Sequence, residues 1–186
     1  MIDEYMTYIE DNKDDLLDSA WSDKHTNEYV DKWGELLLHK KIPELCNLLP
    51  SEIILDIGCG SGSAVRAIAN NLTTGHVTGI DPTPKMLEIA AKQTVNNEYA
   101  QLVTFLLAGA EKIPIESASC DLVIAVNTLH HWVNVNAGLK EVLRILKPSG
   151  RFISIDDLWE ESAEFNQEQP NNNEDFPCKH ELKTRS

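Results

Sequence analysis

The chain has 186 residues, of which 42% are hydrophobic and 25% charged, which are the size and composition of one ordinary globular domain. These values exclude a collagen-like, coiled-coil or wholly disordered chain, and no apolar run approaches the roughly 18 residues needed to cross a bilayer. The net charge of −14 repels phosphate backbones and anionic membrane surfaces, so we expect neither a nucleic-acid nor a membrane partner.

The cysteines and the first residues bear on the cellular setting. Cys46, Cys59, Cys120 and Cys178 are widely separated and form no C-x-x-C pair, so we expect reduced thiols and no metal site. The sequence begins Met-Ile-Asp-Glu, which is acidic where a signal or transit peptide would be basic. These features predict a cytoplasmic protein.

Three stretches follow one another along the chain. Residues 1–50 are predicted to form a helical cap, with helices over about 5–17 and 26–41 and a short segment over 42–49. Residues 51–157 alternate strands (53–55, 77–80, 102–107, 121–126, 151–155) with helices (63–72, 84–95, 137–146), and a turn is expected over 147–150. Residues 158–186 are predicted to form an acidic helix and a flexible tail. The alternation indicates an α/β fold, with a parallel sheet covered by helices on both faces.

A glycine-rich turn between a strand and a helix is the most informative segment. Gly58, Gly60 and Gly62 follow Asp56 in a G-x-G-x-G spacing, whereas the dinucleotide fingerprint G-x-G-x-x-G would need glycine at Ser63. Glycines let a ligand approach the main chain closely, and a carboxylate beside them opposes a pyrophosphate but accepts from an amine. The turn therefore favours a cationic cofactor without phosphates.

A second acid stands about twenty residues further on. Asp81 ends the next predicted strand, where an acid accepts hydrogen bonds from both hydroxyls of a ribose. The two acids together predict a site for an adenosine with a free ribose.

Five ordered motifs from about residue 33 to 157 resemble those of S-adenosylmethionine-dependent methyltransferases, in particular the small-molecule subgroup that includes quinone-biosynthesis enzymes. The motifs are LDIGCGSG (55–62), GIDPTPKML (79–87), AEKIPI (110–115), DLVIAVNTLHHW (121–132) and EVLRILKPSGRF (141–152). The resemblance implies a Rossmann-like doubly wound, mainly parallel sheet of order 3-2-1-4-5. It also implies S-adenosylmethionine as cofactor, S-adenosylhomocysteine as product and a small-molecule methyl acceptor.

The resemblance also implies residue roles at the methionine and ribose end of the cofactor. Asp56 and the backbone at Gly58 and Gly60 would hold the methionine part, Cys59 would fit the turn as a small residue, and Asp81 would hold the ribose.

Further roles follow for the rest of the cofactor. Pro82 or Met86 would pack on the adenine, and Ala110 and Glu111 would border its edge. Asn127 would lie beneath the sulfonium. The family often has aspartate immediately before the Ala-Glu pair, where this chain has Gly109, so adenine binding would rely on main-chain groups or on Glu111.

Methyl transfer from a sulfonium is an in-line displacement, and it needs a base only when the acceptor carries a proton. His130 and His131, just past the fourth strand, are the candidate catalytic bases, with a slight preference for His130; the alternative is that they cap a helix and pack beside Trp132. Trp21, Tyr29 and Trp33 could form a lid or simply pack on the sheet. The remaining histidines, His25, His39, His76 and His180, are expected at the surface.

The family usually ends with a helix and an antiparallel hairpin, for which the last 29 residues leave little room, so we expect the hairpin to be shortened or absent. A sheet edge left uncovered would need a partner, which makes a homodimer possible. Two alternatives to an active small-molecule methyltransferase stay open from the sequence: an inactive methyltransferase-like module that binds the cofactor or a partner, and a nicotinamide oxidoreductase.

Overall fold

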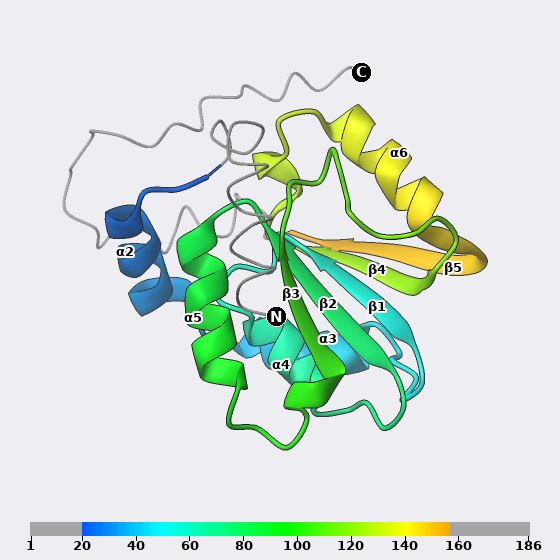
Figure 1. Cartoon of the computed structure of the whole chain (residues 1–186), viewed down its shortest axis with the longest axis horizontal. Coiled ribbons are helices and arrows are strands. Elements are labelled where there is room, and N and C mark those ends of the chain that lie inside the picture. The colour runs from blue at the N-terminus through cyan, green and yellow to red at the C-terminus, as the bar shows by residue number, and fades with distance from the viewer. Residues whose placement is uncertain (1–19, 157–186) are drawn as a thin grey trace. The chain divides into compact units, whose positions relative to one another are not determined.

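A five-stranded parallel sheet forms the centre of the computed structural model, which describes residues 20–156. The strands are β1 (Ile53–Ile57), β2 (His76–Asp81), β3 (Val103–Leu107), β4 (Cys120–Val126) and β5 (Leu146–Ile155). They pair in the order β3-β2-β1-β4-β5, and every pair is parallel (Figure 1). The predicted fold class and strand order are confirmed, whereas the expected absence of a C-terminal hairpin concerns residues outside the described range.

Helices flank the sheet on both sides. They are α2 (Asp23–Trp33), α3 (Leu37–Leu45), α4 (Ser63–Ala69), α5 (Pro84–Thr94) and α6 (Val135–Ile145), with single 3-10 turns η1 (Ala100–Leu102) and η2 (Leu129–His131). None of the helices among residues 20–156 is both long enough and apolar enough to span a membrane. The predicted helix over 5–17 and the predicted C-terminal helix and tail lie outside the described residues.

The strands divide their side chains between two cores because successive residues of a strand face opposite sides of the sheet. In β1, Ile54 packs in a cluster that includes Ile68 of α4 and Leu87 of α5, whereas Leu55 packs in a second cluster with Ile145 of α6. All five side chains are at most 1% exposed. Burying such a side chain stabilises the fold by about 1.5–3 kcal/mol, so the two clusters hold the helices against opposite faces.

The predicted helix over 26–41 is in fact two helices, because the chain breaks at Gly34. A Cβ at Gly34 would lie 2.6 Å from the carbonyl oxygen of Val30, so only glycine fits this turn. Glu35 then forms an ion pair with Arg66 of α4 and accepts a hydrogen bond of 3.0 Å from the Ser63 hydroxyl. These contacts turn the chain so that α3 packs beside α4.

Two further boundaries differ from the sequence prediction. Pro43 lies inside α3 rather than at the start of a new segment, and the buried side chains of Ile42 and Cys46 hold that turn against the core. Residues 147–150 belong to β5 rather than to a separate turn, but they are irregular: β4 advances from Cys120 to Leu122 where β5 advances from Leu146 to Arg151. The extra residues bulge out of the ladder.

An ion pair between a buried glutamate and a partly exposed arginine joins the start of the sheet to its last strand. Glu52, 5% exposed, pairs through Oε1 with Nη1 of Arg151 at 2.8 Å and accepts from the main-chain N–H of Leu49 at 2.8 Å. Arg151 also donates to the carbonyl oxygens of Cys46 and Asn47. The residues that lead from α3 into β1 are therefore tied to β5, within the compact unit that contains residues 20–155; Asp156 belongs to a second unit.

Candidate functional site

A pocket lies at the carboxyl ends of β1, β2, β3 and β4, with α2 at its side. In open parallel sheets, ligands bind outside the carboxyl ends where neighbouring strands lead to helices on opposite faces, which is the position of β1 and β4 here. Of the predicted site residues, ten line the pocket: Asp56, Gly58, Cys59, Asp81, Pro82, Met86, Ala110, Glu111, Asn127 and His131. Gly60 and His130 are the two predicted residues that do not.

The glycine turn is a bare bend of main chain between β1 and α4. Gly58, Gly60 and Gly62 all have left-handed backbone with φ of 71°, 53° and 79°, which glycine adopts without a steric penalty. A Cβ at Gly58 would lie 2.0 Å from Oγ1 of Thr128, so the bend and the end of β4 meet without room for a side chain. Gly60 contributes through its main chain, because its N–H donates to Oδ2 of Asp81 at 2.9 Å.

The two predicted acids converge on the pocket, and both are buried. Asp81 is 7% exposed and accepts main-chain N–H groups on both oxygens, from Gly60 at 2.9 Å and from Thr83 at 2.8 Å. Burial raises the pKa of Asp81 to about 6, although these hydrogen bonds oppose the shift. The Thr83 side chain also donates a hydrogen bond to Asp81. A carboxylate offers about four lone-pair sites, so Asp81 can still accept a ligand hydroxyl.

Asp56 has a different environment at the end of β1. It is 1% exposed, and its Oδ1 has no hydrogen-bond partner. Burial, and then the charge of Asp81, raise the pKa of Asp56 to about 8. A buried acceptor without a partner is rare in folded proteins, and here it lines a pocket that could hold a donor. An amine would satisfy it.

These observations test whether an adenosine-containing sulfonium fits the site. An orphaned carboxylate oxygen, a second carboxylate that can accept a further hydrogen bond and a glycine bend with open space at Gly60 suit an amine, a ribose and a close approach. Two buried acids disfavour a pyrophosphate at the same place. The residues present fit S-adenosylmethionine. Among residues 20–156, no group of three or more His, Cys, Asp or Glu side chains could hold a metal ion.

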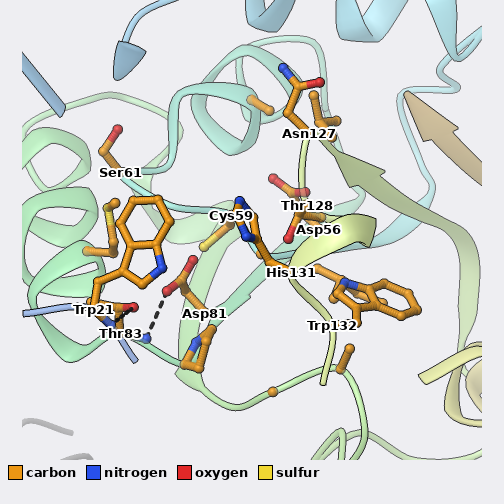
Figure 2. Close-up of a pocket in the computed structure, with 18 of the residues that line it drawn as sticks. Trp21, Asp56, Cys59, Ser61, Asp81, Thr83, Asn127, Thr128, His131 and Trp132 are labelled. Atoms are coloured by element: carbon orange, nitrogen blue, oxygen red, sulfur yellow. Dashed lines mark hydrogen bonds between the residues drawn. The ribbon is translucent and has the colours of Figure 1, made fainter. Parts of the chain in front are cut away.

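Aromatic side chains from the α2 region form one wall of the pocket. Trp21, Tyr29 and Trp33 all line it. The Trp21 ring meets Tyr29 edge-on at 5.0 Å between centroids and meets His131 edge-on at 5.6 Å, and its main-chain N–H donates to Oγ1 of Thr83 at 3.1 Å (Figure 2). Trp21 therefore connects the segment before α2 with the residues that follow β2 and β4. Trp21 lies beside Asp81 in this view, and whether it acts as a lid or only packs stays a prediction (Figure 2).

The end of β4 brings a strained residue and one histidine to the pocket. Asn127 has a φ of 50°, which is uncommon outside glycine, and its N–H donates to the carbonyl of Ile155 at 2.7 Å. His131 lines the pocket. His130 is exposed, and its ring lies 4.0 Å from that of His131. His131 is exposed as well, so the two candidate bases differ in that only His131 lines the pocket, and the choice of base stays a prediction.

Residues 108–111 form the wall that follows β3. All four line the pocket, and Oε1 of Glu111 accepts from the main-chain N–H of Asn134 at 2.9 Å. That carboxylate therefore also holds the loop before α6, a role beyond the predicted one at the adenine edge.

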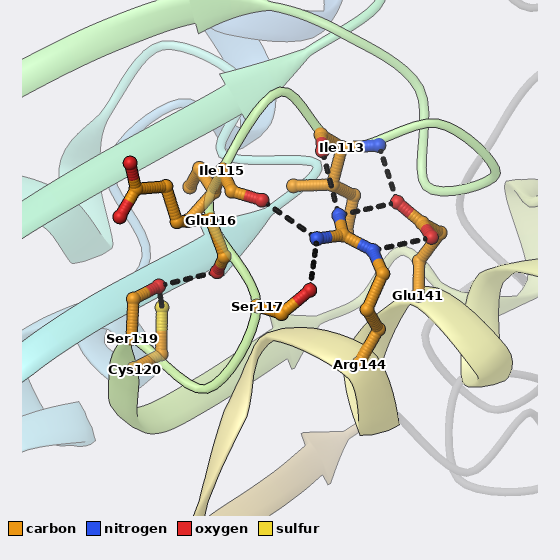
Figure 3. A network of polar contacts seen from close by, with 8 residues as sticks. All are labelled: Ile113, Ile115, Glu116, Ser117, Ser119, Cys120, Glu141 and Arg144. Carbon is orange, nitrogen blue, oxygen red and sulfur yellow. Dashed lines mark hydrogen bonds and ion pairs between the residues drawn. The ribbon is translucent and has the colours of Figure 1, made fainter.

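The rest of the β3–β4 loop is fastened to α6. Arg144 donates to the carbonyl oxygens of Ile113 at 2.9 Å and Ile115 at 2.8 Å, and to Oγ of Ser117 at 3.3 Å (Figure 3). Glu141 pairs with Arg144 and accepts from the N–H of Ile113 at 2.9 Å. α6 thus holds residues 113–117 of the β3–β4 loop, which follow the pocket wall formed by residues 108–111.

Sequence reasoning missed several residues of this site. Thr83, Thr128 and Trp132 are buried and line the pocket, as does His39, which was expected at the surface. Thr83 had a detectable signal, because threonine before Pro84 is a helix N-cap pattern. Thr128, Trp132 and His39 reach the pocket only because of the paths that the loops take, so no local sequence pattern indicates them. His76 is also not fully at the surface: its Nε2 lies 2.9 Å from Oγ1 of Thr104.

Comparison with known proteins agrees with this geometry. The profile of the methyltransferase domain family matches residues 55–154. An O-methyltransferase (rstn1) of Aspergillus nomiae is 30% identical over 86% of this chain and 70% of its own length. The ubiquinone/menaquinone biosynthesis C-methyltransferase UbiE of Bartonella quintana is 32% identical over 55% of this chain, but this chain covers only 40% of that enzyme.

A solved structure supports the fold. A SAM-dependent methyltransferase from Aquifex aeolicus has a TM-score of 0.61 and 23% identity, with 73% of each chain covered. The glycine bend between two buried acids, the strand order and the family match agree, and we conclude that the chain belongs to the family of S-adenosylmethionine-dependent methyltransferase domains.

Proposed function

We propose that the chain transfers the methyl group of S-adenosylmethionine to a small-molecule acceptor. The observation that supports this most directly is Oδ1 of Asp56, a buried acceptor without a partner, close in sequence to Gly60, where a Cβ would meet only Sδ of Met86 at 3.9 Å. When bound, the cofactor supplies an electrophilic methyl group: its sulfur–carbon bond breaks as the acceptor's bond to carbon forms, and S-adenosylhomocysteine leaves. The protein's contribution is alignment, which can supply roughly 7–11 kcal/mol in well-oriented systems.

The residues have separate tasks in this proposal. Asp56 accepts from the amine of the cofactor, and the main chain at Gly58, Cys59 and Gly60 lets the methionine part approach. Asp81 accepts from the ribose with the acceptor capacity that its bonds to Gly60 and Thr83 leave free. The Gly60 N–H supports this role because it orients Asp81.

The rest of the pocket would hold the adenine and the sulfonium of the cofactor. Pro82 and Met86 pack on the adenine, Ala110 and Glu111 border its edge, and Asn127 lies near the sulfonium; all five line the pocket. The left-handed backbone of Asn127 supports its assignment, because strained residues gather where a backbone must be held in an unusual position.

His131 would take the proton of an acceptor that carries one. It lines the pocket and contacts Trp21, so an imidazole stands beside the aromatic wall. His130 would support it through ring contact rather than touch the acceptor. The transferred proton would pass from the acceptor's heteroatom to His131 as the new bond to carbon forms.

The aromatic pocket wall and the net charge of the chain bear on the methyl acceptor, and the cysteines bear on the cellular compartment. Trp21, Tyr29 and Trp33 offer faces that suit an organic small molecule, and the net charge of −14 disfavours nucleic acid and anionic membranes. Three free buried thiols, Cys46, Cys59 and Cys120, are compatible with the reducing conditions of a cytoplasm. We also propose a homodimer in which the second subunit covers the edge strand β5. The molecular mass of the protein in solution tests this.

Calorimetry and a labelled-methyl assay test the function. We expect the protein to bind S-adenosylmethionine and S-adenosylhomocysteine but not NAD, and to label at least one member of a panel of phenols, quinones and amines. Asp81→Ala should weaken cofactor binding by about 1–3 kcal/mol, the effect of removing a hydrogen bond to a charged group. Glu98→Ala, which removes an exposed carboxylate, is the matched control. Unchanged affinity in Asp81→Ala would remove that residue from the site.

A further inference from the structure

Trp132 brings an unpartnered hydrogen-bond donor to the pocket. Its side chain lines the pocket, the residue is 9% exposed, and its Nε1 has no hydrogen-bond partner. Figure 2 shows the indole beside His131, with the nitrogen on the edge of the ring nearer to that residue. Buried N–H groups are nearly always paired, so an orphaned one that lines a ligand pocket points to a ligand acceptor.

The packing around the indole leaves it little freedom to turn its N–H elsewhere. A Cβ built on Gly138 of α6 would lie 2.4 Å from Cε3 of Trp132 and 3.3 Å from Cβ of Ala110. The ring is thus wedged against the main chain of α6 and packs in the apolar cluster with Ala108 and Ile113. A phenylalanine would have no unsatisfied donor but would leave part of this apolar space empty, so it is the unpaired Nε1–H and not the packing that points to a ligand.

The position of Trp132 matches the base end of the bound nucleoside. In the proposed function Asp56 and Asp81 fix the amine and the ribose at the ends of β1 and β2. The base then extends towards residues 108–111 after β3, and Trp132 adjoins Ala110 there. Side chains on this wall offer no other donor: Ala108, Gly109 and Ala110 have no polar side-chain atom, and the Glu111 carboxylate accepts.

We propose that the Nε1–H of Trp132 donates a hydrogen bond to a ring nitrogen of the adenine, which makes Trp132 a specificity-determining residue for the cofactor. This inference rests on the proposed function. Adenine has three ring acceptors, N1, N3 and N7, and its exocyclic amine is a donor. Asp56 offers the orphaned acceptor and Trp132 the orphaned donor, so the two ends of the pocket select a ligand with an amine at one end and an acceptor nitrogen at the other.

The test combines one conservative substitution with three analogues that each lack one ring nitrogen. Binding of S-adenosylhomocysteine and of its 1-deaza, 3-deaza and 7-deaza forms is measured by calorimetry for the wild type and for Trp132→Phe. We expect the wild type to bind one deaza form about tenfold more weakly, the size of one lost hydrogen bond that leaves a buried donor unpaired. Trp132→Phe should bind S-adenosylhomocysteine about tenfold more weakly and should not distinguish that analogue.

Trp33→Phe is the matched control, because Trp33 lines the same pocket but is 42% exposed. It should keep the discrimination among the analogues. If Trp132→Phe weakens the binding of all four ligands equally, or if it preserves the wild-type discrimination, the indole only packs and the proposal is wrong. If the wild type binds none of the four, it is the proposed function that fails.

A measurement on the wild type keeps the test independent of whether Trp132→Phe folds. The chain has four tryptophans, so a ¹⁵N-labelled sample gives four indole N–H resonances. We expect one of them to move downfield with S-adenosylhomocysteine and to stay in place with the deaza form that binds weakly. Four resonances that respond alike to all four ligands would overturn the proposal.

Discussion

Asp56 combines deep burial with an unpaired oxygen, and its protonation should therefore couple to cofactor binding. Because burial raises its pKa from 3.8 to about 8, the folded protein holds a proton there near neutral pH that the unfolded chain has released. This contribution to stability is fully present below pH 3.8 and is lost as the pH rises through 8. An amine needs the ionised carboxylate, so binding should release that proton.

We expect the affinity for S-adenosylmethionine to rise by about 15-fold between pH 6.5 and 8, with a slope that approaches tenfold per pH unit well below the pKa of about 8 and flattens near it, as the release of one proton requires. The window begins above the pKa of about 6 of Asp81, so that Asp81 is already ionised. Calorimetry in two buffers of different ionisation enthalpy measures the released proton. Asp56→Asn, a neutral variant of the same shape, should bind more weakly at pH 8 and should lose the slope.

The stability of the folded protein should depend on the protonation of Asp56 in the opposite direction to the cofactor affinity. Asp56→Asn should match the wild type near pH 5 and should melt at a higher temperature near pH 9, where the wild type has to bury a charge. A variant that is less stable than the wild type at both pH values would show that Asp56 is not held protonated by burial.

At the scale of elements, α6 does more than cover the sheet. The ring of Trp132 packs against Gly138 of this helix. Arg144 and Glu141 of the same helix hold the β3–β4 loop by hydrogen bonds (Figure 3). The segment before α2 acts elsewhere in the pocket, where the N–H of Trp21 donates to Thr83 and its ring contacts His131. The pocket walls thus come from segments far apart in sequence that helices hold in place.

A substitution of Gly138 in α6 tests the contact between this helix and the Trp132 ring. In a helix interior, Gly→Ala normally stabilises by about 0.8–1.0 kcal/mol, but here the new Cβ would lie 2.4 Å from the Trp132 ring. We expect Gly138→Ala to destabilise by about 1–3 kcal/mol, the usual cost of overpacking, and to weaken cofactor binding because the indole must move.

Denaturant unfolding measures the first effect and calorimetry the second. Asn136→Ala, at an exposed position of the same helix, should be neutral or mildly stabilising and should bind normally. A stabilised Gly138→Ala with normal binding would show that Trp132 adapts freely.

At the scale of the whole molecule, the site joins four strand ends with α2, so ligand binding should stabilise the compact unit that contains them. A ligand at a hundred times its dissociation constant stabilises the folded state by about 2.7 kcal/mol. For a protein of this length we expect S-adenosylhomocysteine to raise the melting temperature by roughly 5–10 °C. NAD at the same concentration should not, and equal shifts with both would contradict the assigned cofactor.

The sequence alone determined the parallel sheet, the glycine bend and the two acids, because these depend on local patterns: apolar runs, glycines that need left-handed backbone and acids at strand ends. The five motifs indicated the family, and the strand order followed from that resemblance rather than from a local pattern. The tertiary structure decided which histidine faces the pocket, the break at Gly34 and the presence of Thr128 and Trp132 in the site. These depend on loop paths and on contacts between residues distant in sequence, such as Trp132 with Gly138, and no local spacing encodes such a contact.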